Sequence, residues 1–214
     1  MEVVPGQHSL WVRMMSGELA RFGDEHNHDS RHELGPLPAS TQQLVGGSSF
    51  WCWRDGTQRV TCQAFDVRLP SLPRALALAA TEQQVCAILP NQEVLCYVPL
   101  EAWSATRFPP AHCPSKGGDP SCGEPVRVPT LRDAVQLTAG YKHLCARTQT
   151  GQVYCWEKLD AVERIPLPAQ ARFVQASERR SCALLEDLRV FCWHSEHGVP
   201  VSEVLPSAKS AVLP

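Results

Sequence analysis

The sequence has no long apolar run and no cluster of charges of one sign. No apolar stretch of the 214 residues approaches the roughly 18 residues of a membrane-spanning helix. The nearest thing to a basic cluster is the pair Arg179-Arg180, and 20 basic and 22 acidic residues give a formal net charge of −2. Such a chain has no global field that would attract nucleic acid or an anionic membrane. We therefore expect neither a membrane span nor a nucleic-acid partner.

Motifs that are typical of common enzymes, of cofactor-binding sites and of secretion signals are also missing. The stretch SKGGDP at 115–120 has glycines and a lysine but lacks the spacing of a phosphate-binding loop. Ser48-Ser49 follows two glycines as a strand-end turn rather than as a Gly-x-Ser-x-Gly elbow. The opening MEVVPGQHSL has no basic region followed by an apolar core, so no signal peptide is visible. We expect no cofactor and no enzymatic activity.

By contrast, cysteine, proline and glycine are abundant. Eighteen prolines and 13 glycines interrupt the chain so often that many short strands are favoured over long helices. Ten cysteines are many for a cytosolic protein, and they favour an oxidising compartment or a metal site. We therefore expect an all-β protein with an extracytoplasmic or secreted location.

Eight of the ten cysteines form four pairs, each with a spacing of ten residues. The pairs are Cys52 with Cys62, Cys86 with Cys96, Cys145 with Cys155, and Cys182 with Cys192. Five residues before each first cysteine, a small residue closes a short apolar segment: Gly47, Thr81, Gly140 and Ser177. A fifth copy without cysteines opens the chain, where Gly6, Trp11 and Phe22 align with Gly140, Cys145 and Trp156. The expected repeats are 1–40, 41–73, 74–103, 126–168 and 169–205, with a loop insertion at 104–125 in the third repeat.

Each cysteine pair brackets a β-hairpin. Asp55-Gly56 is a strong hairpin signal, and Thr150-Gly151 is also turn chemistry. Cysteines equidistant from such a turn face each other at a Cα separation of about 4.5 Å, which a disulfide can bridge. We therefore predict one disulfide in each hairpin. Free cysteines packed as small apolar residues are an alternative, and so is zinc, although structural zinc sites favour cysteines two to four residues apart.

The remaining parts of one repeat complete a four-stranded sheet. An apolar strand precedes the hairpin, and a proline-flanked segment such as VERIPLP, residues 162–168, suits an outer edge strand after it. Four short strands in roughly 37 residues are typical of a propeller blade. Aromatic residues recur at fixed positions of the repeat, so we predict that they pack between blades, with a ligand groove as the alternative. They are Trp51, Trp53, Tyr97, Trp156 and Trp193.

The sequence thus predicts a single β-propeller domain over residues 1–214, with about five four-stranded blades. The final stretch SAKSAVLP resembles the beginning of a further strand. It would either complete the first blade and close a five-bladed ring, or begin another blade of a larger propeller of which this chain is a fragment.

The stretch DAVQLTAGYKHLCARTQTGQVYCW, residues 133–156, resembles the repeat of the regulator of chromosome condensation family. The matching residues are Gly140, His143, Cys145, Ala146, Gly151, Cys155 and Trp156. SERRSCALLEDLRVFCW, residues 177–193, resembles it at Ser181, Cys182, Ala183, Cys192 and Trp193. The family's Trp-Gly and Gly-Gln-Leu-Gly segments are absent, and the family usually builds seven blades.

The two-cysteine form of the repeat is similar to bacterial extracytoplasmic members of that family. The resemblance implies a non-enzymatic protein-interaction scaffold that binds a macromolecular partner, another protein, through loops on one face. We expect the chain itself to be a monomer. A carbohydrate-binding surface module is an alternative, and an enzyme with its site in the propeller channel is another.

The insertion at 104–125 is the strongest candidate for a binding site. It is polar, rich in proline and glycine, and holds the last two cysteines, Cys113 and Cys122, which are candidates for a fifth disulfide. Insertions into repeats form loops on one face, often the binding face. The candidate contact residues in and beside it are Trp103, Arg107, Phe108, His112 and Lys116. A decorative loop without a partner is the alternative.

Histidines at two places in the sequence are candidates for chemistry. His26, His28 and His32 stand among acidic residues in DEHNHDSRHE, and three imidazoles so close could bind a divalent metal. A polar loop between strands explains them equally, and we expect no metal there. His143 lies two residues before Cys145 and so on the same side of a strand. Rather than a catalytic Cys–His pair, we expect Cys145 in a disulfide and His143 packed between blades.

Overall fold

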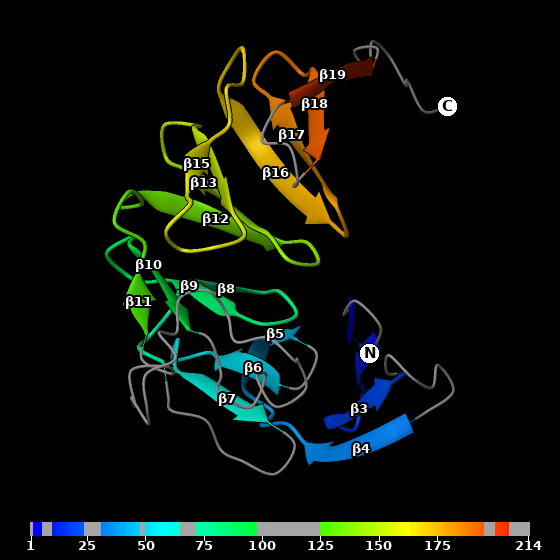
Figure 1. The fold of residues 1–214 in the computed structure, drawn as a ribbon. Helices are drawn as coiled ribbons and strands as arrows, with labels where there is room; N and C mark the ends of the chain where they lie inside the picture. The colour runs from blue at the N-terminus through cyan, green and yellow to red at the C-terminus, as the bar shows by residue number, and fades with distance from the viewer. Residues whose placement is uncertain are drawn as a thin grey trace, which may run out of the picture.

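All regular structure in the described part of the chain is β-strand. The computed structural model describes residues 2–5, 10–23, 31–47, 50–64, 72–97, 125–194 and 200–205, and their strands are numbered β1 to β19 (Figure 1). These strands form five antiparallel sheets that follow the chain in order. The prediction of an all-β protein built from several small antiparallel sheets is confirmed.

The strands are short and consecutive within every sheet. The first sheet contains β1 (Glu2–Pro5), β2 (Leu10–Arg13), β3 (Glu18–Phe22) and β4 (Arg31–Pro36). The second contains β5 (Thr41–Gly46), β6 (Phe50–Asp55) and β7 (Val60–Ala64). The third contains β8 (Ala77–Ala80), β9 (Val85–Ile88), β10 (Val94–Tyr97) and β11 (Val126–Arg127). The fourth contains β12 (Ala134–Ala139), β13 (Leu144–Thr148), β14 (Val153–Trp156) and β15 (Glu163–Arg164). The fifth contains β16 (Ala171–Ser177), β17 (Arg180–Leu185), β18 (Val190–His194) and β19 (Pro200–Leu205).

The five sheets are arranged as blades along an arc. Consecutive sheets contact each other through their first strands: β1 with β5, β5 with β8, β8 with β12, and β12 with β16. Figure 1 shows the first and fifth sheets at the two ends of this arc, with an opening between them. The first sheet already has four strands from residues 2–36. The stretch SAKSAVLP, which was considered as a closing strand, lies outside the described residues.

Apolar clusters between consecutive sheets hold the blades together. Each of the four clusters combines side chains from two neighbouring sheets, which agrees with the rule that a single blade cannot bury both of its faces. The repeated aromatic residues Trp51, Tyr97, Trp156 and Trp193 are at most 2% exposed. Trp53 is partly buried against the cluster between the first two sheets. The prediction that these aromatic residues pack between blades is confirmed.

The four cysteine pairs are disulfides between directly opposed strand residues. Each first cysteine pairs in register with the cysteine ten residues later, at a Cα separation of 4.0 to 4.1 Å. Closing a loop of this length stabilises the folded chain by about 2–3 kcal/mol. The alternatives of free thiols and of zinc are therefore wrong for these eight cysteines. Cys113 and Cys122 lie outside the described residues.

Two glutamines clamp neighbouring sheets at equivalent positions of the repeat. The amide of Gln43 accepts from the Leu78 backbone N–H at 3.0 Å and donates to the Leu78 carbonyl at 2.8 Å. Gln136 does the same with Val174, at 3.1 and 2.7 Å. Leu78 and Val174 lie on first strands, whose free edges leave backbone groups without a ladder partner. The glutamine amides satisfy these groups and fix the distance between blades.

The third sheet is completed after the insertion rather than before it. Val126 and Arg127, which the repeat boundaries place in the fourth repeat, pair with Cys96 and Leu95 of β10. A strand of two residues carries too little periodicity to be recognised in the sequence. Residues 98–124 therefore connect two neighbouring strands of one sheet. The proline-flanked segment VERIPLP does contain an outer strand, β15.

Candidate interaction face

The topology gives every sheet two distinct ends. The connection between the first and second strands, and that between the third and fourth, lie at one end, which we call the loop face. The turn between the two cysteine-bearing strands lies at the other end, which we call the hairpin face. The third, fourth and fifth sheets share this orientation, because their first loops bond to one another: Glu82 N–H donates to the Tyr141 carbonyl at 3.1 Å, and Tyr141 N–H to the Glu178 carbonyl at 2.8 Å.

The segments that carry the predicted site residues begin and end at the loop face. Tyr97 ends β10 and Val126 begins β11, and residues 98–124 run between them. Residues 24–30 run in the same way between the end of β3 and the start of β4. The candidate contact residues are Trp103, Arg107, Phe108, His112 and Lys116, and they lie outside the described residues, as do His26 and His28. His32 belongs to β4, of which only the backbone is described at this position.

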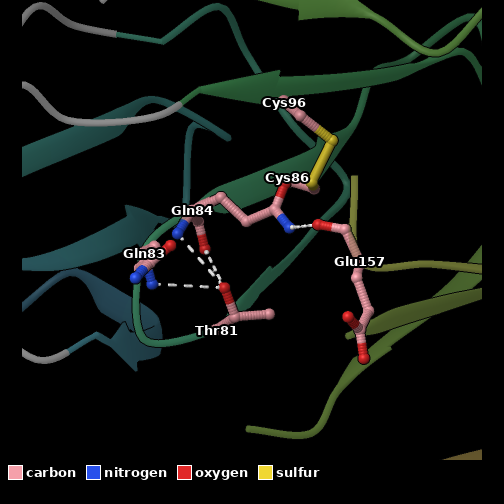
Figure 2. Close-up of a disulfide and its surroundings, with 6 residues drawn as sticks. All are labelled: Thr81, Gln83, Gln84, Cys86, Cys96 and Glu157. Carbon is pink, nitrogen blue, oxygen red and sulfur yellow. Dashed lines mark hydrogen bonds between the residues drawn. A yellow bond between two sulfur atoms is a disulfide. The ribbon is translucent and has the colours of Figure 1, made fainter. Parts of the chain in front are cut away.

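The first loops of the third, fourth and fifth sheets form a continuous rim on the loop face. We call residues 81–84, 140–143 and 177–180 the loop rim. Within its first loop, Thr81 Oγ1 accepts from the backbone N–H groups of Gln83 and Gln84 at 3.3 and 3.1 Å. The side chain of Gln84 reaches across to the fourth sheet and donates to the Glu157 carbonyl at 3.0 Å (Figure 2). The rim is therefore held in one arrangement by hydrogen bonds between blades.

Charges of both signs alternate along this rim and the adjoining loop of the fourth sheet. The exposed cationic residues are Lys142, Lys158, Arg179 and Arg180, and the exposed anionic residues are Glu157, Asp160 and Glu178. The Lys142 ammonium group lies 4.9 Å from the centre of the Tyr141 ring, within range of a cation–π contact. A surface of interleaved charges suits the polar surface of a protein better than a polyphosphate backbone, which calls for uniform positive charge.

His143 is sealed inside the interface between the fourth and fifth sheets. Its side chain is 2% exposed, and its Nε2 atom lies 2.7 Å from the Oγ atom of Ser181, which is fully buried. Cys145, which lies 3.4 Å from the same hydroxyl, is in a disulfide. No substrate can reach this group, so the structure supports the packing role predicted for His143 rather than a catalytic one. Burial lowers the pKa of His143 from 6.5 to about 4.

The burial of His143 predicts a specific loss of stability in mild acid. Its folded-state pKa of about 4 lies below the unfolded value, so the unfolded chain binds more protons between pH 6.5 and 4. The stability that this group contributes is present above pH 6.5 and is lost as the pH falls toward 4. From pH 7 to pH 5 the loss amounts to about 2 kcal/mol. Urea unfolding at pH 7 and pH 5 should show this loss of unfolding free energy in the wild type and a smaller loss in His143→Asn. If the loss is the same in both proteins, other groups cause it.

The residues that the structure describes contain neither a cluster of metal-binding side chains nor a membrane-spanning helix. Among them, no group of three or more histidine, cysteine or acidic side chains is placed to hold a metal ion. In the same residues, no helix is long and apolar enough to cross a membrane.

Comparison with known proteins identifies the repeat. Residues 134–156 match the Regulator of chromosome condensation (RCC1) repeat. The regulator of chromosome condensation of Mus musculus is 34% identical over 87 residues, covering 34% of this chain and 21% of that protein. The chain thus spans about a fifth of the length of this curated relative.

Solved structures resemble nearly the whole chain at low sequence identity. The CRINKLY WD40 ectodomain of the Arabidopsis thaliana receptor kinase ACR4 matches with a TM-score of 0.61 and 19% identity, covering 97% of this chain and 66% of that one. Yeast RCC1 (Prp20), bound to Kap60, matches with a TM-score of 0.63 and 12% identity, covering 90% and 55%. A second structure of Prp20p from Saccharomyces cerevisiae, described with its binding to Gsp1p and histones, gives 0.60 and 12%, covering 90% and 57%. The chain is therefore a β-propeller structure whose fourth sheet carries a regulator of chromosome condensation repeat.

Proposed function

We propose that this chain is a non-enzymatic scaffold that binds another protein through its loop face. The observation that carries the proposal is the hydrogen-bonded loop rim, which joins three blades into one fixed surface. A surface that is already ordered loses little conformational entropy on binding, and this favours affinity. The yeast structures support a protein partner, since that propeller is bound to Kap60 in one of them.

The partner that fits the loop rim is a folded protein with a polar surface of mixed charge. Lys142 and Lys158 are both exposed on loops of the fourth sheet. Glu157 and Glu178 lie beside them with the opposite charge. Such interleaved charges attract a partner whose charges have the opposite sign at each position. They repel a partner whose charges would lie opposite charges of the same sign. The insertion at 104–125 would extend the same face, because the strand ends that bracket it lie there.

Charge reversal on the two faces tests this proposal. The wild-type chain is immobilised, and its partner is captured from extracts of the source organism and identified. The dissociation constant of the complex is then measured with the purified partner. The double substitution Lys142→Glu with Lys158→Glu should weaken binding by at least about tenfold, since it turns two attractions into repulsions. Deleting residues 104–122 should abolish capture.

A matched control lies on the hairpin face. Arg74 and Arg132 are exposed and precede the first strands of the third and fourth sheets, at the hairpin end. Arg74→Glu with Arg132→Glu makes the same change of net charge and should leave binding unchanged. If this control weakens binding as much as the loop-face pair, the partner does not use the loop face. Circular dichroism of all variants confirms that they remain folded.

A further inference from the structure

The first strand of each sheet has one edge that pairs with no strand of its own sheet. β5, β8, β12 and β16 pair only with the second strands of their sheets, and consecutive sheets contact each other through these first strands. Their free edges therefore line the inner side of the arc (Figure 1). In an antiparallel ladder the N–H and C=O groups of one residue point to the same edge, and the edge alternates along the strand. Every second residue of a first strand thus points both groups to the inner side.

The third and fifth sheets use such a residue to bind a glutamine of the preceding sheet. Leu78 N–H donates to the amide oxygen of Gln43 at 3.0 Å, and the Leu78 carbonyl accepts from its amide nitrogen at 2.8 Å. Val174 makes the same two bonds with Gln136, at 3.1 and 2.7 Å. These contacts show which chemical group fits the inner edge. It is a primary carboxamide, whose oxygen and one N–H lie side by side.

The fourth sheet has an equivalent residue on its first strand, Leu137. Leu137 pairs with Ala146 and Val174 pairs with Ala183, and each of these alanines directly follows the first cysteine of its hairpin. Leu137 therefore points its N–H and C=O groups to the inner side as well. Its side chain is partly exposed, whereas that of Val174 is fully buried.

The third sheet supplies no glutamine to this residue. Ala77 pairs with Ile88 and Gln136 pairs with Arg147, and each partner lies two residues after the first cysteine of its hairpin. Ala77 thus stands where the second and fourth sheets have glutamine, and its methyl group can neither donate nor accept. Within the described part of the chain, no hydrogen bond joins the backbone of Leu137 to the third sheet. A donor and an acceptor with the spacing of a carboxamide remain unpaired there.

Two exposed apolar side chains flank these unpaired groups. Leu76 is 41% exposed and directly precedes the alanine at the glutamine position, and Val135 is 39% exposed and lies two residues before Leu137. The equivalent residues of the second and fifth sheets are exposed too, but they are the polar Gln42 and Arg172. The apolar pair is therefore particular to the junction between the third and fourth sheets. A ligand that carries an apolar group beside its carboxamide would bury both side chains.

We propose that the inner edge between the third and fourth sheets binds a primary carboxamide attached to an apolar group. The carboxamide oxygen accepts from the Leu137 N–H, its nitrogen donates to the Leu137 carbonyl, and the apolar group packs on Leu76 and Val135. The carboxamide belongs either to a small molecule or to a glutamine or asparagine side chain of a partner protein. A carboxylate does not fit, because it has no N–H to donate to the carbonyl. The site lies apart from the loop face, so it does not depend on the function proposed for that face.

Titration of the isotope-labelled full chain with benzamide tests the proposal by nuclear magnetic resonance. The amide resonance of Leu137 should shift and saturate with a dissociation constant on the order of 1 mM, as expected for so small a ligand. Benzoate and N-methylbenzamide should bind at least about tenfold more weakly. Benzoate lacks the donor, and in N-methylbenzamide a methyl group replaces the N–H beside the oxygen. An unmoved Leu137 resonance, or equal binding of the three compounds, would overturn the proposal.

A pair of blocked peptides distinguishes the two sources of the carboxamide. The first is the tripeptide leucine-glutamine-valine with an acetyl group and a methylamide at its ends, and the second has glutamate in place of glutamine. If the glutamine peptide binds more tightly than benzamide and the glutamate peptide at least about tenfold more weakly, the site takes a side chain of a partner protein. If benzamide binds more tightly, the site takes a small molecule. Equal binding of the two peptides contradicts the requirement for a carboxamide.

Ala77→Gln supplies the carboxamide from the chain itself. In the wild type the Leu137 N–H should exchange with solvent at least about tenfold faster than those of Leu78 and Val174, since only the latter two are bonded to a glutamine. Ala77→Gln should remove this difference and should weaken benzamide binding at least about tenfold, because the site is then filled. Ala77→Met is the matched control, with a side chain of similar length and no amide, and it should leave Leu137 exchange fast. If Ala77→Gln leaves exchange of Leu137 unchanged, this edge does not bind a carboxamide and the proposal is wrong.

A second variant tests the apolar half of the site. Leu76→Ala should weaken benzamide binding by about three- to tenfold, because it removes part of the surface on which the ring packs. Val126→Ala is the matched control, since Val126 is 48% exposed on β11, the outer strand of the same sheet, and it should bind benzamide like the wild type. Equal binding by the two variants would contradict the role of Leu76. Circular dichroism confirms that all variants are folded.

Discussion

Replacing Trp156 by alanine is expected to destabilise the chain by about 4 kcal/mol, because it removes the largest side chain between the third and fourth sheets. Trp156 is 2% exposed and packs in the same cluster as Leu131, Ala134 and Leu144. This cluster joins two blades, so the loss weakens their contact as well as the sheet that holds the residue. Equilibrium unfolding in urea at neutral pH, with the disulfides intact, measures the effect.

Two control variants distinguish packing from other causes. The indole N–H of Trp156 is buried and makes no hydrogen bond in the structure, so its removal should cost little. Trp156→Phe should therefore cost only about 1–2 kcal/mol, since most of the buried ring is kept. Phe173→Ala changes a residue that is 48% exposed and should stay within about 0.5 kcal/mol of the wild type. If Trp156→Phe were as damaging as Trp156→Ala, packing would not explain the role of this residue.

The sequence was sufficient to predict the sheets and their disulfides because both depend on local spacing. Two cysteines ten residues apart with a turn signal between them can oppose each other across a hairpin, and all four pairs do so. The burial of Trp51, Trp156 and Trp193 was predictable for a related reason. A residue that recurs at one position of every repeat meets the same neighbours in each blade interface.

Contacts between repeats were not predictable from the sequence, since no pattern within one repeat reports them. Gln43 and Gln136 are polar residues on strands and suggest solvent exposure, but their amides bind the backbone of the next sheet. The short strand β11 was missed because it has only two residues and because 28 residues, 98–125, separate it from its partner β10. The contact residues predicted in the insertion stay a prediction.

The small residue five positions before each first cysteine has a physical explanation in two of the sheets. In the second and fourth sheets it is glycine, and a ring lies directly over it. A Cβ atom at Gly47 would stand 2.3 Å from the Phe50 ring, and one at Gly140 would stand 2.2 Å from the His143 ring. In the third sheet the residue is Thr81, and Gln84 extends away to the fourth sheet instead. Glycine is therefore required where the side chain three residues later folds back over the loop.

Replacing Gly140 by alanine is accordingly expected to destabilise the chain by about 3 kcal/mol through overpacking. The new methyl group would lie 2.2 and 2.7 Å from two atoms of the His143 ring and 3.0 Å from the Glu178 carbonyl oxygen. The ring cannot move freely, because it is buried and lies 2.7 Å from the Ser181 hydroxyl. The carbonyl cannot move without disturbing its hydrogen bond from Tyr141. Urea unfolding measures the loss, and Gly56→Ala is the matched control, since its Cβ would meet only the flexible end of Gln42, at 3.3 Å.

A double-mutant cycle identifies the ring of His143 as the main obstacle. His143→Ala alone leaves a cavity and is itself destabilising, but it removes two of the three close contacts of the new methyl group. Gly140→Ala should therefore cost less in the His143→Ala background than in the wild type, by about 1–2 kcal/mol. Additive losses would mean that the loop backbone, rather than the ring, excludes a side chain at this position. Because Gly140 and His143 lie on the loop rim between the fourth and fifth sheets, the same variant should also weaken partner capture at temperatures where the chain is still folded.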